Sequence, residues 1–255
     1  MRYFKICLVS IFFFCKPFNS LAWGPEGHRI TGKVAYQLLD QKTKDSVKYY
    51  LGDLSLENAA NWMDEIKSNP QFDYMKPWHY INIDKGKYFD STQTDNIVVE
   101  LNTVIKRLKG KNKHSKEEIA VDIKILTHLI GDLHQPLHDG YAVDTGGNAI
   151  QVRFFAWPSN LHRVWDSEII TQLNINSKDC LKEVSRFSKA DVIQYKQGTI
   201  VDWLYESRSH LDQIYDFRNG NITDQYALKN SPLVEKQLAI AGFRLSQLLT
   251  EIFGS

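Results

Sequence analysis

Apolar residues recur at spacings of three and four along most of the chain, as expected for helices that bury one face. Two short segments, residues 79–83 (HYINI) and 149–157 (AIQVRFFAW), are instead rich in β-branched and aromatic residues and are better suited to strands. The periodic segments predict helices over residues 27–39, 43–51, 57–67, 97–108, 116–134, 161–173, 190–208 and 234–253. We therefore expect a mainly α protein with a short β-hairpin.

The predicted elements are joined by polar, glycine-containing connectors, none of which is long or biased enough to mark a domain boundary. These connectors span residues 84–96, 109–115, 139–148 and 216–231. The sequence contains no internal repeat. We expect a single domain.

Residues 1–22 have the pattern of a secretory signal. Basic residues at the start precede an apolar run over residues 6–14, and Ser20-Leu21-Ala22 matches a small-x-small cleavage site. The alternative, a permanent membrane anchor, would need about 20 apolar residues. We expect residues 23–255 to form the working domain, secreted or periplasmic after cleavage following Ala22, with no stable membrane anchor.

Loss of this signal changes the charge and the cysteine content. The full chain has a formal charge of +1, and three of its basic residues lie in the signal, which leaves −2. Positive charge for a polyanionic substrate would therefore have to come from elsewhere. Cys7 and Cys15 are also in the signal, so Cys180 remains alone, no intramolecular disulfide can form, and we expect Cys180 to be a small core residue.

The densest chemical signal is the segment HLIGDLHQPLHD, residues 128–139. His128 and Asp132 are four residues apart on a predicted helix and project from one face, and His134 and His138 repeat that spacing around Pro136. A solvated polar face is the alternative, but the intervening residues are apolar. Because each buried imidazole needs a partner, this segment favours metal ligation.

Other segments supply further nitrogen and oxygen donors. His162 and Asp166 are again four residues apart, whereas Asp64 and His79 are isolated, and any one of these residues is more often a cap or a surface group. Together the candidates are five imidazoles and three carboxylates: His28, His79, His128, His138, His162, Asp64, Asp132 and Asp166. This donor set suits zinc, is too large for one tetrahedral ion, and points to two or three ions in a catalytic arrangement.

Trp23 would become the first residue after signal cleavage, five positions before His28. Its freed amino group, with an ordinary pKa near 8, and its carbonyl oxygen could then chelate the ion held by His28. Removal of the signal would thus complete the metal site.

The chain resembles the zinc-dependent single-strand nucleases of the S1/P1 type, in the superfamily that also contains zinc phospholipase C. The resemblance rests on an ordered set of motifs: WGPEGH, NWMDEIK, WHYIN, HLIGDLHQPLH, GGNAIQV, LHRVWD, DWLYES and SPLVEKQLAIAGFRL. It implies a mostly helical domain with a three-zinc cluster at the bottom of a cleft.

The resemblance also implies how the ligands are shared among the three ions. One zinc would be held by Asp64, His79, His128 and Asp132, a close neighbour by Trp23, His28 and the bridging Asp132, and a more separate ion by His138, His162 and Asp166. His134 would orient one of these ligands.

In such a cluster the bridged zinc pair would activate a water molecule for attack on phosphorus, and the third ion would stabilise the leaving oxygen. Lys67, one turn beyond Asp64, would neutralise the phosphoryl oxygens, although from sequence alone it could equally be an ordinary exposed lysine. The implied substrates are single-stranded DNA and RNA and 3′-nucleotides, with 5′-phosphorylated products.

The resemblance assigns a base-binding role to a second set of residues. Tyr80 would stack on an unpaired base, and Asn82 with Gly146, Gly147 and Asn148 would form the surrounding pocket. The fungal enzymes carry an aspartate where Asn82 stands here. An amide both donates and accepts hydrogen bonds, so base preference cannot be carried over.

Two other functions fit the donor set. A zinc phospholipase C would use the same cluster, but that branch has a first histidine farther from the N-terminal tryptophan and a glutamate where Asp166 stands. A zinc-storage protein would bind metal without turnover. We expect the nuclease, acting as a monomer.

Overall fold

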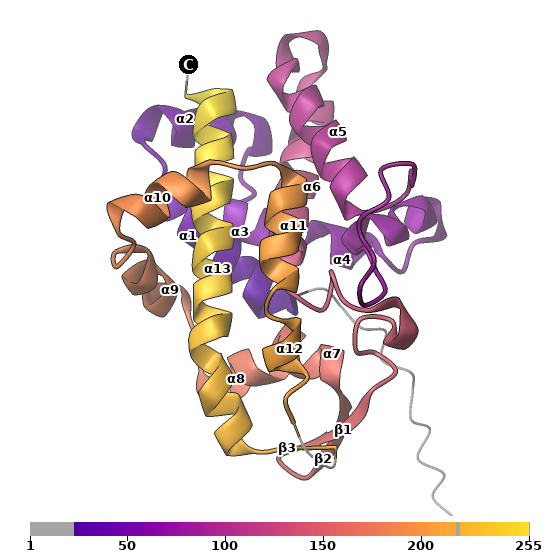
Figure 1. Ribbon diagram of the computed structural model, residues 1–255. Coiled ribbons are helices and arrows are strands. Elements are labelled where there is room, and N and C mark those ends of the chain that lie inside the picture. Colours follow the sequence, from indigo (N-terminus) through magenta and orange to yellow (C-terminus); the bar gives the residue numbers. More distant parts are fainter. Residues whose placement is uncertain (1–22, 218–219, 255) are drawn as a thin grey trace, which may run out of the picture.

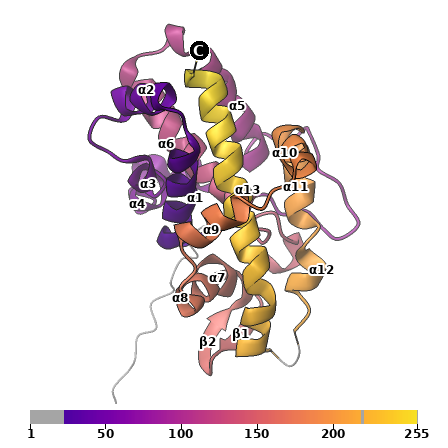
Figure 2. The same cartoon turned by 90° about the vertical axis from the view of Figure 1, so that its left-hand side faces the viewer.

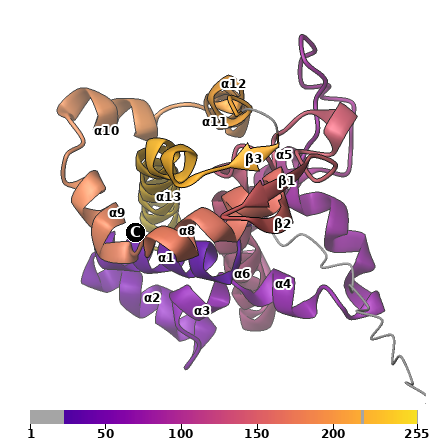
Figure 3. The same cartoon turned by 90° about the horizontal axis from the view of Figure 1, so that it is seen from below.

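The computed structural model describes residues 23–217 and 220–254, so the predicted signal lies outside the described residues. The long helix α13 (Asp224–Phe253) runs through the molecule and packs against α1 (Pro25–Leu38) and α6 (Lys116–Leu133). Figure 3 shows α13 nearly end-on, with α1 to α3 on one side and α11 and α12 on the other. The predicted mainly α fold is confirmed.

The remaining helices are shorter and surround these three. They are α2 (Gln41–Leu51), α3 (Leu56–Ala59), α4 (Trp62–Ile66), α5 (Ile97–Lys109), α7 (Leu161–Arg163), α8 (Ile169–Leu173), α9 (Ser177–Val184), α10 (Lys189–Lys196), α11 (Ile200–Arg208) and α12 (Leu211–Ile214). A 3-10 helix, η1 (Pro70–His79), follows α4, and a π-helical segment, η4 (Val164–Glu168), joins α7 to α8.

A small sheet completes the fold. β1 (Gln151–Phe154) pairs antiparallel with β2 (Trp157–Asn160) and parallel with β3 (Asn221–Ile222), in the order β2-β1-β3. The predicted hairpin is confirmed, and its second strand leads directly into α7. In Figures 1 and 2 the sheet lies at one end of the molecule and α2 at the other.

The apolar faces meet in two large clusters. One lies among α2, α5, α6, α11 and the C-terminal half of α13, and the other joins α8, the strands and the N-terminal half of α13. Trp23 and Cys180 are fully buried in the second cluster. Cys180 is therefore the core residue expected from the sequence.

Two predicted helices are broken. The segment predicted over residues 190–208 is interrupted by Gly198, whose φ of +95° ends α10, and α11 then begins with a capping box between Thr199 and Asp202. The segment predicted over residues 57–67 divides into α3 and α4.

Two further predictions require correction. The connector predicted over residues 216–231 is helical from Asp224 onward, because Thr223 caps α13 and the helix continues through Pro232. Residues 79–83 form no strand: Ile81 and Ile83 instead donate backbone hydrogen bonds to the carbonyls of His138 and Gly140 in a neighbouring loop. Helices α9 and α12 were not predicted, although α9 begins with a capping box between Asn176 and Asp179.

None of the helices in residues 23–217 and 220–254 has the length and apolar character needed to cross a membrane.

Candidate metal centre and substrate cleft

The last two turns of α6 carry His128 and Asp132, and both side chains are fully buried. The helix begins at a capping box between Ser115 and Glu118 and ends at Leu133. The 18 residues between these ends place the i, i+4 pair deep inside the molecule.

Asp132 lies at the centre of a group of imidazoles. Its Oδ1 atom is 3.3 Å from Nε2 of His28. Its Oδ2 atom is 3.0 Å from Nδ1 of His79 and 3.2 Å from Nε2 of His128. The rings of His28 and His128 stack with their centroids 3.8 Å apart. One carboxylate thus faces histidines from α1, η1 and α6, and Nδ1 of a fourth, His138, lies 3.9 Å from its Oδ1.

Gly131 allows α1 to approach α6 this closely. A Cβ atom at Gly131 would lie 2.9 Å from Nδ1 of His28 and 3.7 Å from Cδ1 of Trp23. The next residue of the chain, Gly24, donates its backbone N–H to the carbonyl of Asp166 at 2.7 Å. Trp23 and Gly24 therefore lie between two groups of candidate ligands.

A second carboxylate organises the remaining pair of histidines. Asp166 places Oδ1 3.6 Å from Nε2 of His138 and Oδ2 3.2 Å from Nε2 of His162. The side-chain amide of Gln135 donates a hydrogen bond to the same Oδ1, while its oxygen accepts one from the N–H of Leu137. Gln135 thereby fixes the orientation of Asp166.

Three of the imidazoles bond a backbone carbonyl on the side away from the carboxylates. The pairs are His128 with Ala60 at 2.6 Å, His138 with His79 at 2.7 Å and His162 with Gly146 at 2.6 Å, each through Nδ1. Since a carbonyl only accepts, Nδ1 carries the proton and Nε2 keeps its lone pair. Metal-binding histidines are commonly held in this way.

The charges of the buried groups depend on one another. Burial lowers the pKa of His79 to about 4. Burial alone would raise the pKa of Asp132, but the facing His128 and His138 outweigh it and hold that pKa well below its usual range. Asp132 and Asp166 in turn raise the pKa of His138 to about 9 despite its burial. Asp132 therefore stays ionised, and a divalent cation could replace the protons that balance its charge.

Several buried polar atoms of this cluster have no hydrogen-bond partner, as expected of atoms that ligate an ion. They are Asp64 Oδ1 and Oδ2, His28 Nδ1 and Nε2, Asp132 Oδ1 and His138 Nε2. Three groups have ligand atoms within 4.8 Å of one another: His28 with Asp64 and His128, His79 with His128 and Asp132, and His138 with His162 and Asp166. The residues present can hold metal ions.

These groups largely match the ligand sets implied by the family resemblance. The set of His138, His162 and Asp166 is found as one group. The other two sets interleave, because His128 belongs to two groups and Asp64 lies with His28. All the predicted side-chain ligands thus come together in one region.

A cleft of about 450 Å³ opens above the candidate ligands. Its lining residues are Lys67, Lys76, His79, Tyr80, Asn82, Leu137, His138, Thr145, Asn148 and His162. Lys67 lies 3.8 Å from Oδ1 of Asp64, and Tyr80 is 44% exposed, so a cation and an aromatic ring are both accessible from the cleft.

The sequence of the whole domain identifies the family to which this site belongs. The family S1/P1 Nuclease matches residues 23–254. The chain belongs to the S1/P1 nuclease family. Family membership identifies it as a nuclease, an enzyme whose substrate is nucleic acid, and its His and Asp groups fit a metal-dependent member.

Known members of this family are similar along nearly the whole chain. Endonuclease 4 of Arabidopsis thaliana is 30% identical over 280 residues, covering 93% of this chain and 91% of the relative. Nuclease S1 of Aspergillus oryzae is 25% identical over 264 residues, covering 89% and 90%. Nuclease P1 of Penicillium citrinum is 25% identical over 271 residues, covering 91% and 98%.

In this S1/P1 nuclease the two glycines of the GGN segment support the cleft, and Asn148 lines it. Gly146 and Gly147 have φ values of +62° and +81°, which favour glycine. A Cβ atom at Gly146 would lie 2.2 Å from the carbonyl oxygen of Leu137 and 3.2 Å from Oδ1 of Asn82. In this tight turn the backbone of Gly146 lies against Asn82. The Gly146 carbonyl accepts a hydrogen bond from Nδ1 of His162.

The family resemblance implies that His134 orients a metal ligand, but the ring of His134 bonds other groups. Its Nδ1 donates to the carbonyl of Ile130 at 2.7 Å, and its Nε2 accepts from Nη1 of Arg244 at 2.8 Å. Burial, together with the charge of Arg244, lowers the pKa of His134 to about 3, so the ring is neutral. His134 links the end of α6 to α13.

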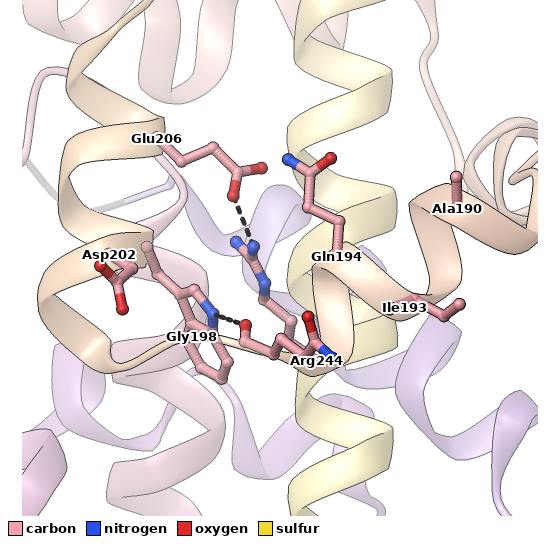
Figure 4. Close-up of a pocket in the computed structure, with 9 residues that line it drawn as sticks. Ala190, Ile193, Gln194, Gly198, Asp202, Glu206 and Arg244 are labelled. Atoms are coloured by element: carbon pink, nitrogen blue, oxygen red, sulfur yellow. Dashed lines mark hydrogen bonds and ion pairs between the residues drawn. The ribbon is translucent and has the colours of Figure 1, made fainter.

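Arg244 lies at the base of a second cavity, of about 570 Å³, between α10 and α11. Figure 4 shows its guanidinium directed at Glu206, and Nη2 donates to that carboxylate at 2.5 Å. The guanidinium also lies over the ring of Trp203, 4.6 Å from its centroid. Arg244 therefore joins α11 and α13 to the ring of His134.

Three residues of this region were not predicted from the sequence. Lys76 and Thr145 line the cleft, and Gln135 bonds Asp166. Only their positions beside His79, Gly146 and His134 in the chain could have drawn attention to them.

Proposed function

We propose that this nuclease is an exported zinc-dependent phosphodiesterase that hydrolyses single-stranded DNA and RNA to 5′-phosphorylated products and removes 3′-phosphates from nucleotides. The observation that carries the proposal is the convergence of three His and Asp groups beneath a cleft that also presents Lys67 and Tyr80. During export the signal would be cleaved after Ala22, so that Trp23 becomes the first residue of the mature protein.

Three zinc ions would be held by the side chains of these groups and by the amine and carbonyl of Trp23. The donors are imidazole nitrogens and carboxylate oxygens, which suit zinc. When bound, the ions would supply positive charge to the phosphate and make a water molecule more acidic. Asp132 suits a bridging position because its two oxygens face different histidines.

The other cleft residues would bind and orient the substrate. Lys67 would place its ammonium against the phosphoryl oxygens, where charge increases during reaction. Tyr80 would stack on an unpaired base, a contact worth about 1 to 3 kcal/mol that a paired and stacked duplex cannot offer. Asn82 and Asn148 would meet the edge of that base with amides that both donate and accept.

A phospholipase activity is the less favoured alternative. Endonuclease 4, nuclease S1 and nuclease P1 are named as nucleases, and the short spacing from Trp23 to His28 also favours that branch. A storage protein would not need the open cleft.

The test is incubation of zinc-loaded protein that begins at Trp23 with a single-stranded oligonucleotide and with the matching duplex. We expect cleavage of the single strand, 5′-phosphate on the new ends and loss of activity with a chelator. Asp64→Asn is the control for a contaminating nuclease. Zinc uptake without cleavage would favour storage, and cleavage only of phosphatidylcholine vesicles would favour the phospholipase.

A further inference from the structure

We propose that Lys76 forms a second phosphate-binding site in the cleft, which takes the phosphodiester next to the one being cleaved. The proposal rests on the proposed nuclease function, because it names a subsite of that same cleft. It would make Lys76 a residue that distinguishes polynucleotides from substrates with a single phosphate.

The cleft contains two ammonium groups with different surroundings. Lys67 lies 3.8 Å from Asp64, a candidate metal ligand, and its side chain is 22% exposed, so it belongs to the reacting phosphate. Lys76 comes from η1, pairs with Asp73 at 2.6 Å, and is 49% exposed. Asp73 is not among the residues that line the cleft.

The ion pair of Lys76 would give way to a phosphate at little cost. Asp73 is 55% exposed, and exposed pairs of this kind contribute only about 0 to 1 kcal/mol. The Lys76 ammonium can exchange the Asp73 carboxylate for a phosphate of the substrate, and the exposed Asp73 carboxylate is then solvated by water. Lys76 is thus available to substrate although it has a partner.

The chemistry of the substrate supplies a ligand for this second cation. A dinucleotide has one phosphodiester, which the candidate metal ligands and Lys67 would occupy, whereas each added nucleotide brings another negative charge. Lys76 and Tyr80, four residues apart in the chain, line the same cleft, so the ammonium and the proposed base-stacking ring face one substrate. A neighbouring phosphate of a strand stacked on Tyr80 is therefore the ligand that its charge and position fit.

The experiment compares the dinucleotide dTpdT, with one phosphate, and the trinucleotide dTpdTpdT, with two, in zinc-loaded protein that begins at Trp23. In wild type kcat/KM should be higher for the trinucleotide. Lys76→Ala should reduce that advantage by about three- to tenfold, as expected for one partly exposed charge contact. On a longer strand the dependence of log kcat/KM on log salt should become shallower by about 0.7.

Two further variants separate this effect from folding and from total charge. Lys76→Arg should retain the advantage, and Asp73→Asn should increase it by removing the competing carboxylate. The matched control is the pair of Lys109 and Glu251, 2.7 Å apart with exposures of 50% and 59%, at the ends of α5 and α13. Lys109→Ala and Glu251→Gln carry the same changes in charge and should leave the ratio unchanged.

Equal losses on both substrates in Lys76→Ala would overturn this inference, as would equal effects of Lys76→Ala and Lys109→Ala. Either result leaves the proposed nuclease function intact. If wild-type protein cleaves neither substrate, the proposed function itself fails.

Discussion

Asp132 is fully buried, and its two oxygens face different imidazoles, Oδ1 that of His28 and Oδ2 that of His79. Asp166 is also buried; it faces His138 and His162 and is held by the amide of Gln135. Both aspartates are therefore buried, but Asp132 faces more imidazoles than Asp166 does.

This difference predicts unequal metal loss. Asp132→Asn should release more zinc than Asp166→Asn, because the first substitution weakens a group shared between two proposed ions and the second affects one. Elemental analysis of the purified variants measures this directly, with circular dichroism as the check that both are folded. Equal or reversed losses would contradict the bridging role of Asp132.

At the residue scale the sequence indicated which candidate donors share a helix face, but not the residues that support them. The i, i+4 spacing of His128 with Asp132 and of His162 with Asp166 follows from helix geometry, so it could be read directly. The approach of His28 to α6 depends on the space left at Gly131, and the role of Gln135 depends on a bond across 31 residues. Neither is a local property of the sequence.

At the scale of elements, α6 and α13 are joined by polar contacts as well as by apolar packing. Arg244 donates to His134 at the end of α6 and to Glu206 on α11. Its side chain is 1% exposed, so these groups would lose a buried partner if it were removed.

We therefore expect Arg244→Met to lower the free energy of unfolding by about 2 to 4 kcal/mol, since it leaves buried polar groups unpaired. Urea denaturation followed by circular dichroism gives the value. Arg186→Met is the control, because Arg186 is 60% exposed in its pair with Glu183 and should cost under about 1 kcal/mol. Similar losses in the two variants would show that the buried link is of little consequence.

The boundaries of helices were predictable where the caps are strong. The start of α6 at residue 116 follows from Ser115 and Glu118, and the break before α11 has the same kind of signal in Thr199 and Asp202, which periodicity alone overlooked. Residues 79–83 alternate correctly, with Ile81 and Ile83 buried, but they pair with a loop. The alternation of apolar residues indicated which side chains are buried. It could not indicate which segment accepts the backbone hydrogen bonds.

At the scale of the molecule, the candidate ligands lie where the two apolar clusters meet. Helix α6 belongs to the first cluster, whereas Trp23, Leu137 and Leu161 belong to the second. The ions proposed here would therefore connect two parts of the core, and their binding energy would add to folding.

Removal of metal should consequently destabilise the whole domain. Each buried donor left without a partner costs about 1 to 3 kcal/mol, so chelation should lower Tm by roughly 10 °C or more. Differential scanning calorimetry before and after chelation measures the shift. Zinc should restore Tm and magnesium should not, because imidazole ligands suit zinc. A Tm that does not change on chelation would contradict a structural contribution from the ions.

The burial of Trp23 has a practical consequence for anyone who handles this enzyme. The Trp23 side chain is enclosed, and the N–H of Gly24 is bonded to Asp166. A purification tag or fusion partner joined to Trp23 would occupy the amine proposed to bind zinc. Gly254, which follows the last turn of α13 at the upper end of Figure 1, is the better attachment point. Immobilisation on a support should use that end too, because it would leave the Trp23 amine unmodified.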